Sequence, residues 1–548
     1  MQTITTDVLV IGGGATGAGC LRDLAMRGIR AVLVEKGDMT HGTTGRYHGL
    51  LHSGGRYVVK DQQSARECAV ENLVLRKIMP HCIEDTSGFF VSTPFDDPAY
   101  GDTFVEGCRT TGVACQEIGI SEMLRREPHL NPRISRVFEV NDASADSFLA
   151  TDLNVASARE HGGQALPYHA VVDLIREGDR VCGAVVEELS SGEHKRIEAA
   201  YVLNAAGAWA GKIAAFAGVT VTVVPGKGVM VAMNHRMVNT VINRCKMPAD
   251  GDIIVPAHTV AVIGTTDRHV PDPDVYGIDP DEVALMIEEG EKLVPGFANY
   301  RALRAWAGVR PLYKDQDVKD DRDISRTYKL LDHKQRDGVT GLLSIVGGKW
   351  TTYRMMAQEA VDEIAKQLGN STPCRTADEL LPHNTPHTFH WKGERLARIE
   401  RDDTYGDLIC ECELVTRSDV IESIGNGARN IDDIRRDTRL GMGPCQGGFC
   451  TYRAAALWEE TQQAAPGPHD ELALSGALLR HFLQERWKGL TSIMWGDQLR
   501  QARLDEIMYL DTLGVDLLPH GGENAEAGQG IVTQHTAIAT EYPDKVTA

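Results

Sequence analysis

The first thirty-five residues constrain the fold more than any other part of the chain. Val8 to Ile11 is an unbroken aliphatic run, and it leads directly into Gly12-Gly-Gly-Ala-Thr-Gly17. A helix-forming stretch from Ala18 to Arg27 follows, and a second apolar run, Ala31 to Val34, ends on Glu35. Strand, glycine loop, helix, strand and acid in this order predict a βαβ unit that binds a dinucleotide.

Each part of this unit has a task at the cofactor. Gly12 permits the tight turn, Gly14 lets the backbone approach a pyrophosphate, and Gly17 lets helix and strand pack closely. Backbone amides at the start of the helix then face the phosphates. Glu35 can accept hydrogen bonds from a ribose 2′-hydroxyl and would repel the 2′-phosphate of NADP. The pattern does not distinguish FAD from NAD.

Length, charge and composition limit the possible functions. At 548 residues the chain is long enough for about three domains, and 42% hydrophobic with 24% charged residues excludes wholesale disorder. The net charge of −20 argues against nucleic acid and against unaided binding to an anionic membrane. No apolar stretch reaches about 18 residues and no signal segment opens the chain, so we expect a cytosolic protein unless a partner carries it to a membrane.

The order of predicted elements indicates a dinucleotide domain built from separated pieces. Predicted strands cover residues 166–172, 180–187, 199–204, 219–224, 253–255, 260–263 and 342–346. Predicted helices cover residues 64–79, 150–161 and 351–368. The alternation places a second, β-rich layer inside the dinucleotide domain. We therefore predict one domain over residues 1–371 that binds both cofactor and substrate.

The remainder of the chain divides by composition. Residues 372–406 begin with a stretch rich in Pro, His and Thr and are predicted to be a linker, and 407–460 form a small four-cysteine unit. Residues 461–517 are predicted to be helical, with an amphipathic helix over 472–487. Residues 518–548 have few large apolar groups, so we expect a mobile tail there. Helices 64–79 and 472–487 are expected to bury Leu73 and Trp487 on their apolar sides.

Four of the twelve cysteines form the second strong signal. Cys410 and Cys412 form a C-x-C pair, and Cys445 and Cys450 form a C-x4-C pair further along. Four thiolates on two loops suffice for one four-coordinate site. Zinc sites usually use wider pairs at both ends, so the C-x-C spacing fits a [2Fe–2S] cluster better, with zinc as the alternative occupant. The other eight cysteines are expected to be buried small hydrophobic groups.

Basic residues gather in two glycine-rich loops of this acidic chain. Arg56 and Tyr57 closely follow His52, and Arg310 has Arg326 and Lys349 downstream. Most single arginines are surface or ion-paired groups, but several in such loops favour an anionic substrate, because the guanidinium fork matches phosphate oxygens. His52 is either a hydrogen-bonded structural residue or the base that takes the proton of an alcohol while a flavin takes the hydride.

In combination, five motifs resemble the FAD-dependent glycerol-3-phosphate dehydrogenases. They are Ile11-Gly-Gly-Gly-Ala-Thr-Gly17, His48-Gly-Leu-Leu-His-Ser-Gly-Gly-Arg-Tyr57, Ile263-Gly-Thr-Thr-Asp267, Gly308-Val-Arg-Pro-Leu312 and Gly347-Gly-Lys-Trp-Thr-Thr-Tyr-Arg354. The cysteine unit resembles that of the large A subunits of the anaerobic enzymes, which carry a bacterioferritin-associated-ferredoxin-like [2Fe–2S] domain. The resemblance covers residues 1 to about 490.

The resemblance implies a fold class and a set of site residues. The fold is α/β + α: a Rossmann-like FAD-binding domain of the D-amino-acid-oxidase/glycerol-3-phosphate-dehydrogenase type with an interleaved β-rich substrate domain, then a small helical four-cysteine domain. The implied phosphate-binding residues are Arg56, Tyr57, Arg310, Arg326 and Lys349, and the implied base is His52. The implied FAD-binding residues are Gly12, Gly13, Gly14, Gly17, Glu35, Thr43, Thr44, Val171, Ala206, Gly207, Gly348 and Thr351.

The resemblance also implies an activity and partners. The family oxidises sn-glycerol 3-phosphate to dihydroxyacetone phosphate by hydride transfer to FAD. Electrons then pass through the iron–sulfur centre, a flavin-type B subunit and a membrane-anchoring iron–sulfur C subunit to a menaquinone pool. The implied location is the cytoplasm, peripheral to the inner face of the cell membrane, with no membrane span of its own.

Two other functions stay open from the residues alone. One is an FAD oxidoreductase of the same fold that acts on a 2-hydroxy acid or an amine and uses oxygen. The cysteine unit argues against it, because a cluster would be idle if oxygen reoxidised the flavin directly. The other is a scaffold protein of a larger dehydrogenase, in which the cysteine unit is a zinc-stabilised docking module.

Overall fold

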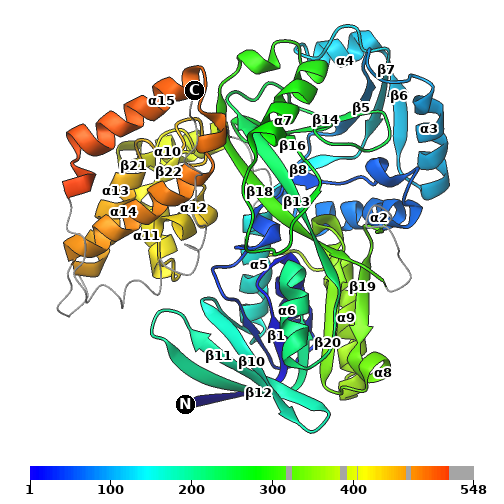
Figure 1. The fold of residues 1–548 in the computed structure, drawn as a ribbon, viewed down its shortest axis with the longest axis vertical. Helices are drawn as coiled ribbons and strands as arrows, with labels where there is room; N and C mark the ends of the chain where they lie inside the picture. The colour runs from blue at the N-terminus through cyan, green and yellow to red at the C-terminus, as the bar shows by residue number, and fades with distance from the viewer. Residues whose placement is uncertain (316–323, 383–391, 404, 464–470, 518–548) are drawn as a thin grey trace, which may run out of the picture.

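The computed structural model describes residues 1–315, 324–382, 392–403, 405–463 and 471–517. A large body contains two sheets, and a smaller helical body with the C-terminal elements lies beside it (Figure 1). The tail predicted over 518–548 lies outside the described residues, as do residues 383–391 and 404 of the predicted linker.

The first sheet is built around the N-terminal strand. Its strands are β1 (Gln2–Ile11), β2 (Ala31–Val34), β9 (Gln164–Leu166), β10 (His169–Glu177), β11 (Arg180–Glu188), β12 (Glu193–Asn204), β19 (Tyr328–Asp332) and β20 (Leu342–Gly347). β1 pairs in parallel with β2 and β12, β9 continues beyond β2, and β20 lies beside the end of β12. β10, β11 and β19 add antiparallel pairs. This parallel centre confirms the predicted Rossmann-like unit.

Two layers bury the faces of this sheet. α1 (Ala15–Met26), α5 (Ser147–Glu160) and α9 (Tyr353–Leu368) cover one face, into which Val8 and Val10 point. Leu9 and Ile11 point to the other face, which packs against α6 (Ala210–Phe216) and the β10–β11 hairpin. Successive side chains of a strand alternate between faces, so burial of both explains the continuous apolar run in the sequence.

The second sheet interrupts the first along the chain. Its strands are β5 (Gly88–Ser92), β6 (Cys115–Ile118), β7 (Arg136–Val140), β13 (Val223–Met233), β14 (Val241–Arg244), β15 (Ile253–Ala257), β16 (Val260–Gly264), β17 (Arg268–His269) and β18 (Ala302–Tyr313). The long antiparallel pair β13–β18 forms one end, and β5, β7 and β6 form the other. The interleaving that the sequence predicts is therefore confirmed.

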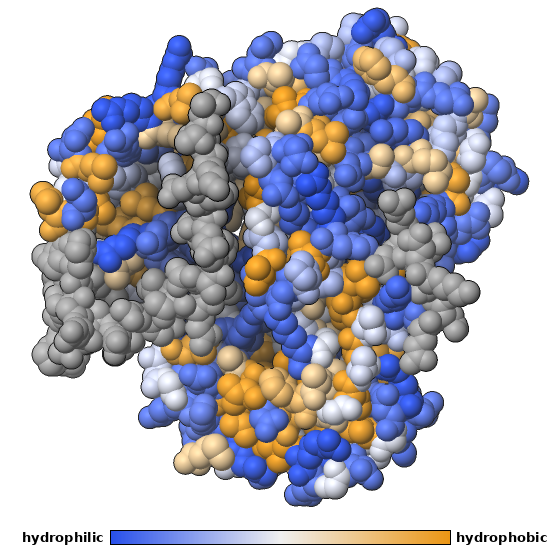
Figure 2. Space-filling model, viewed as in Figure 1, coloured by the Kyte–Doolittle hydropathy of each residue, from blue (hydrophilic) through white to orange (hydrophobic). Residues whose placement is uncertain are grey.

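Shorter elements complete the large body. A three-stranded sheet joins β3 (Leu50–Leu51), β4 (Ile83–Glu84) and β8 (Ala143–Ala145). The remaining helices here are α2 (Gln62–Ile78), α3 (Tyr100–Thr111), α4 (Ile120–Arg126), α7 (Pro280–Leu293) and α8 (His333–Asp337). On the face in Figure 2, hydrophilic residues dominate the upper part of the body, and hydrophobic ones gather lower down, around α6, β10 and β11.

The C-terminal body is small and mainly helical. It contains β21 (Leu408–Cys410), β22 (Val415–Thr416), α10 (Lys392–Arg401), α11 (Arg417–Gly425), α12 (Ile431–Thr438), α13 (Thr451–Gln463), α14 (Glu471–Lys488) and α15 (Asp497–Glu506). Its core joins Cys410 and Cys450 to Trp458, Leu478 and Phe482. None of the helices in the described ranges combines the length and apolar character that a membrane-spanning helix needs.

Several local predictions need correction. Leu73 is 60% exposed and Trp487 is 54% exposed, because each helix buries a narrower stripe than its apolar residues suggest. The strand predicted from residue 219 begins at Val223, and the helix predicted from Thr351 begins at Tyr353 after a 3-10 turn. Three cysteines expected to be buried are only half-buried: Cys115, Cys182 and Cys374.

Candidate active site and four-cysteine centre

One cavity of about 1160 Å³ collects most of the predicted site residues. It is larger than the roughly 300–1,000 Å³ of most small-molecule pockets, which suits a dinucleotide with a second ligand. The predicted residues that line it are Gly12, Gly14, Glu35, Thr43, Thr44, His52, Arg56, Tyr57, Val171, Ala206, Gly207, Arg310, Arg326, Gly348 and Lys349. Gly13, Gly17 and Thr351 do not line it.

The dinucleotide end of the cavity is built from close backbone contacts. Gly12 has a φ of 117°, and a Cβ there would lie 2.6 Å from the carbonyl oxygen of Ala205. A Cβ at Gly17 would lie 1.9 Å from the carbonyl oxygen of Gly12, so Gly17 permits helix packing without facing the ligand. The loop can therefore leave its amides open to a pyrophosphate, and it fits the cofactor's phosphates.

Glu35 is held in place from both sides. Its Oε2 accepts a hydrogen bond from the Gly13 amide at 2.7 Å, and its Oε1 accepts one from Gly37 at 2.9 Å. Burial raises the pKa of this carboxyl, against the lowering effect of the two amides. Each oxygen keeps a second lone pair, so the side chain can still accept a ribose hydroxyl. Gly13 thus contributes by orienting Glu35.

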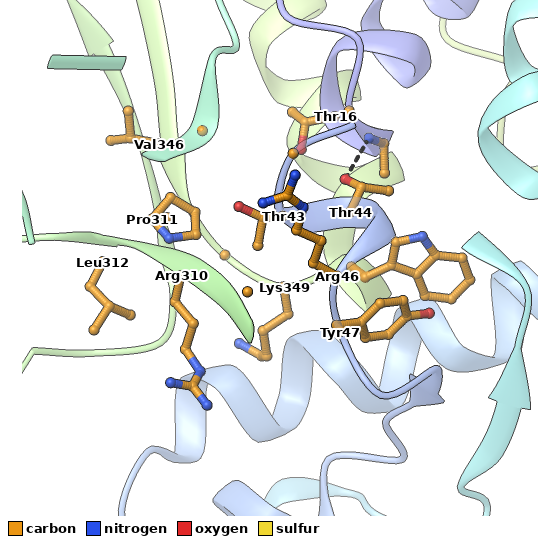
Figure 3. A pocket seen from close by; sticks show the side chains of 18 of the residues that line it. Thr16, Thr43, Thr44, Arg46, Tyr47, Arg310, Pro311, Leu312, Val346 and Lys349 are labelled. Atoms are coloured by element: carbon orange, nitrogen blue, oxygen red, sulfur yellow. Dashed lines mark hydrogen bonds between the residues drawn. The ribbon is translucent and has the colours of Figure 1, made fainter. Parts of the chain in front are cut away.

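Two threonines hold the loop that closes the phosphate region. Thr44 Oγ1 accepts a hydrogen bond from the Ala15 amide at 3.0 Å, drawn as a dashed line in Figure 3. Thr43 Oγ1 donates to the carbonyl of Val309 on β18 at 2.6 Å. This second contact links the cofactor loop to the substrate sheet, so the cavity spans both layers.

Three cations converge at the opposite end of the cavity. Arg310 and Lys349 approach one another from β18 and from the loop after β20 (Figure 3). Arg310 donates to Asp267 at 3.0 Å, and Arg326 donates to the other oxygen of the same carboxylate at 2.7 Å. The Lys349 ammonium donates to the Arg326 carbonyl at 2.7 Å and stands 4.9 Å from the Tyr57 ring centre. The Asp267 carboxylate therefore bridges Arg310 and Arg326, and Asp61 and Asp250 also line the cavity.

Asp267 has an electrostatic task that no sequence argument assigned to it. Desolvation alone would raise its pKa, but Arg310 and Arg326 outweigh that effect and hold the pKa below its usual value. The carboxylate therefore stays ionised and keeps the two guanidinium groups close together. Its only signal in the sequence is its place at the end of the Ile263–Asp267 motif.

Arg56 differs from the other predicted phosphate ligands. Its guanidinium donates to the fully buried Asp252 at 2.7 Å and to the Ala249 carbonyl at 3.1 Å. Arg56 lines the cavity, but its charge is already paired. Arg46 also lines the cavity and donates to the Tyr276 hydroxyl at 2.6 Å, and the sequence analysis missed it.

Two histidines lie together in the same cavity. The ring centres of His48 and His52 are 6.1 Å apart, and His52 lies 5.4 Å from the ring of Tyr57. Desolvation, His48 and Arg56 lower the pKa of His52 well below its usual value. The Thr351 hydroxyl accepts the His52 backbone amide at 3.0 Å. Thr351 therefore positions His52, and His52 is neutral and able to accept a proton.

The neutral state of His48 predicts a pH-dependent stability. Desolvation, Arg56 and Arg310 lower the pKa of His48 to about 3, and its Nδ1 accepts the Leu50 amide at 3.2 Å. Below a pH of about 6.5 the unfolded chain binds a proton that the folded chain does not bind, so stability is present above that pH and falls with pH below it. We expect His48→Asn, which keeps an acceptor, to reduce this loss by about 2 kcal/mol between pH 7 and pH 5.

The measurement is the free energy of unfolding of the wild-type protein and of His48→Asn at pH 7 and at pH 5. The exposed His129, which lies outside the cavity, supplies the control variant His129→Asn, and this variant should track the wild-type protein. An equal loss of stability in His48→Asn and in the wild type would show that His48 does not contribute to the loss of stability at low pH.

The four predicted cysteines converge in the C-terminal body. The Cys412 sulfur lies 3.7 Å from Cys410 and 3.7 Å from Cys445, and Cys450 is buried beside them in the same core. A Cβ at Gly443 would come within 2.6 Å of the Cys412 sulfur, so the loop needs glycine there. Four converging thiols with no bulky neighbour on that side fit an iron–sulfur cluster.

The four thiols act on one another: contacts between the thiols lower the pKa of Cys410 and Cys445 and raise that of Cys412 and Cys450. The Cys412 thiol and the amides of Gly447 and Phe449 lower the pKa of Cys445 to about 6, although desolvation opposes them. The thiols of Cys412 and Cys450, and then the amides of Gly441 and Glu413, lower the pKa of Cys410. Thiolate is the form that binds metal, and amides that bond the sulfurs raise the potential of a cluster.

Comparison with known proteins assigns both sites to families. The FAD dependent oxidoreductase family matches residues 7–354, and the BFD-like [2Fe-2S] binding domain matches residues 408–460. The A1 subunit of the anaerobic glycerol-3-phosphate dehydrogenase of Haloferax volcanii is 44% identical, covering 93% of this chain and 91% of its own. The A subunit of the Escherichia coli K12 enzyme is 41% identical, covering 93% and 97%.

The chain belongs to the family of anaerobic glycerol-3-phosphate dehydrogenase A subunits. A crystal structure of the glycerol-3-phosphate dehydrogenase of Bacillus halodurans with FAD has a TM-score of 0.56 at 21% identity, covering 94% of this chain and 95% of that one. It supports the fold. Membership in this family confirms the predicted fold class and confirms FAD and a [2Fe–2S] cluster as the cofactors, in preference to NAD and zinc.

Proposed function

We propose that this subunit oxidises sn-glycerol 3-phosphate to dihydroxyacetone phosphate. The observation that carries the proposal is the convergence of Arg310, Arg326 and Lys349 beside the neutral His52, in a chain whose net charge is −20. Such a chain needs a local group of cations to attract a phosphate dianion. The names of the relatives that cover almost the whole chain support the same substrate.

In this proposal the cations bind the phosphate and leave the alcohol at the histidines. Arg310 and Arg326 offer guanidinium forks that Asp267 holds together, and Lys349 supplies a point charge. Tyr57 lies between this group and His52, so its hydroxyl can bond the substrate. Arg56 has its charge paired with Asp252 and shapes the wall. We assign Arg310, Arg326 and Lys349 most of the phosphate affinity.

His52 is the proposed base. It accepts the proton of the C2 hydroxyl, since its lowered pKa keeps the imidazole neutral before substrate binds. The phosphate dianion then raises the affinity of the imidazole for that proton. Bound FAD supplies the hydride acceptor, taking two electrons and one hydrogen from C2. The products are the ketone, a protonated His52 and the reduced cofactor, so atoms and electrons balance.

We further propose how the chain holds FAD and where its domains end. Gly12, Gly14 and Glu35 serve the AMP half, and the rest of the predicted set, Thr43, Thr44, Val171, Ala206, Gly207 and Gly348, lines the path of the cofactor. The other three predicted residues do not line the cavity and support its walls instead: Gly13 hydrogen-bonds Glu35, Gly17 allows α1 to pack closely, and Thr351 hydrogen-bonds the His52 backbone. The composition of the chain suggests domain boundaries at residues 371, 406, 460 and 517, and we propose them with two qualifications from the fold: α10 lies before the boundary at 406, and α13 continues past 460 to Gln463.

We propose that this subunit works in a complex. Its relatives are named as A and A1 subunits, which supports partners for this chain. The finer assignment is a flavin-type B subunit and a membrane-anchoring C subunit that carry electrons from the [2Fe–2S] cluster to menaquinone. The chain would then lie at the inner face of the cell membrane through these partners.

An anaerobic absorbance spectrum of the FAD-loaded chain tests the substrate. We expect glycerol 3-phosphate to bleach the oxidised-flavin band, with partial bleaching of the broader iron–sulfur absorption as electrons move on. The matched control is glycerol, which has the same alcohol and no phosphate and should leave both bands unchanged. A flavin that stays oxidised with glycerol 3-phosphate would contradict the assignment of this substrate to the chain.

A further inference from the structure

The iron–sulfur domain touches the FAD-binding domain through a buried ion pair. Arg436 on α12 donates from Nε to Asp38 at 2.7 Å, and it pairs with Asp433 on its own helix at 2.5 Å. The exposed fraction is 12% for the Arg436 side chain, 2% for that of Asp433 and 19% for that of Asp38. One guanidinium therefore bridges two carboxylates, one from each domain, in a region that excludes most water.

A tyrosine extends the same contact. The Tyr168 hydroxyl donates to the second oxygen of Asp433 at 2.5 Å, and the Arg429 guanidinium lies 4.5 Å from the Tyr168 ring centre. Tyr168 has a φ of 59°, in the left-handed region that non-glycine residues seldom adopt. The iron–sulfur domain thus contacts the tight turn between β9 and β10 at Tyr168, the residue of that turn with a left-handed backbone conformation.

The two segments held by α12 are the two that face the adenosine end of the cavity. Asp38 follows Glu35 by three residues, and the Tyr168 amide donates to the Gly37 carbonyl at 2.9 Å. The next amide, of His169, donates to the Glu35 carbonyl at 2.8 Å. Glu35, His169 and Val171 line the cavity, but among the described residues none of the iron–sulfur domain does.

A second contact reaches the phosphate loop. Arg439, one residue after α12, lies 3.3 Å from Glu413 and 3.6 Å from Asp146 of the FAD domain. Asp146 caps α5, and the neighbouring Ser147 hydroxyl donates to the Thr44 carbonyl at 2.8 Å. The small domain is therefore tied both to the segment that carries Glu35 and to the loop at the phosphates.

We propose that the iron–sulfur domain is part of the FAD-binding apparatus and that Arg436 is a positioning residue for the adenosine end of FAD. Without its guanidinium, Asp38 and Asp433 are two nearby carboxylates with no shared cation. They repel each other, and the segment that carries Glu35 moves away from the helix. The cost appears as weaker FAD binding although Arg436 never touches the cofactor.

Coupling of this kind acts in both directions. If docking of the small domain improves FAD binding, then FAD strengthens docking by the same factor. Flavin loading thereby stabilises the arrangement in which the electron acceptor of the chain lies beside the flavin domain. The inference needs only that the chain binds FAD, which its family establishes, so its failure and a failure of the substrate assignment are distinguishable.

The first test measures FAD affinity by fluorescence titration of the flavin-free chain that retains its cluster. We expect Arg436→Ala to bind FAD about tenfold more weakly and Arg436→Lys to recover part of the loss. Arg417→Ala breaks an exposed pair with Glu460 in the same domain and should bind FAD like the wild type. With glycerol 3-phosphate, Arg436→Ala should need about tenfold more FAD than the wild type to reach full activity, whereas Arg417→Ala should saturate at the same FAD concentration as the wild type.

A double-mutant cycle and a proteolysis assay complete the test. Arg436→Ala and Asp38→Asn should weaken FAD binding by less together than the product of their separate effects, because they break one interaction. In the wild-type chain, FAD should slow protease cleavage between the two domains, and this assay decides the question if Arg436→Ala fails to fold. Wild-type FAD affinity in Arg436→Ala, or cleavage that FAD does not change, would overturn the proposal.

Discussion

Arg310→Ala should lower kcat/KM for glycerol 3-phosphate by about 100-fold, mainly through KM. Arg310 is one of the three cations that we assign to the substrate phosphate. A charge-assisted hydrogen bond between a guanidinium and a phosphate contributes about 3 kcal/mol when the pair is enclosed. The loss falls on substrate binding, because the side chain lies away from the dinucleotide loop. FAD content, measured from the flavin absorbance per chain, should therefore stay unchanged.

Two further variants sharpen this experiment. Arg310→Lys keeps the charge but loses the fork, so its KM should fall between those of Ala and wild type. Arg268→Ala removes an exposed arginine on the neighbouring strand β17, which pairs with Asp279 instead of lining the cavity, and should behave like the wild type. Normal kinetics in Arg310→Ala would take Arg310 out of the phosphate site.

Cys450→Ser should remove the iron–sulfur cluster and interrupt electron transfer beyond the flavin. Cys450 is 1% exposed and stands just before α13, where no other described side chain can take its place as a sulfur ligand. Iron–sulfur clusters select soft thiolate ligands over harder oxygen ligands such as serine. Iron and acid-labile sulfide should fall from about two of each per chain toward zero, and reduction of a quinone by the complex should fall about 100-fold or more.

The flavin half-reaction separates this effect from loss of the fold. When Cys450→Ser is saturated with FAD, glycerol 3-phosphate should still bleach the flavin, because the residues that line the cavity belong to the other domain. Cys182→Ser, at a half-buried thiol in β11, is the matched control and should keep its iron. If Cys450→Ser retained its full iron content, the four-cysteine assignment would be wrong. A cluster-free variant with normal quinone reduction would show that electrons leave by another route.

Much of the fold and the nature of both cofactors could be predicted from the sequence because their chemistry depends on local spacing. The glycines of residues 12–17 must fall at set intervals for a backbone to approach phosphate, and Glu35 must end the next strand. The C-x-C and C-x4-C spacings of the two cysteine pairs likewise indicate a [2Fe–2S] cluster. The apolar runs of β1 and β2 identify strands buried on both faces, and the structure confirms these two strands.

The predictions that were less accurate concern residues whose role depends on which other elements lie next to them. Thr351 and Gly13 belong to cofactor motifs, yet in the structure they bond His52 and Glu35 from behind the cavity wall. Leu73 and Trp487 satisfy the helical period but are exposed, because the width of a buried stripe depends on what packs against the helix. Periodicity and motif identity report a position along an element, and they do not report its neighbours.

By itself, the sequence determined the dinucleotide unit, the four thiols and a supply of cations in glycine loops. Only the tertiary structure decided which cations remain available. Arg56 is paired with Asp252, whereas Arg310 and Arg326 share Asp267 and face the cavity. It also joined Arg436 to Asp38, nearly four hundred residues away along the chain. Local spacing is encoded residue by residue, but pairing between distant charges follows from how whole sheets and helices pack, and no short stretch of sequence contains that information.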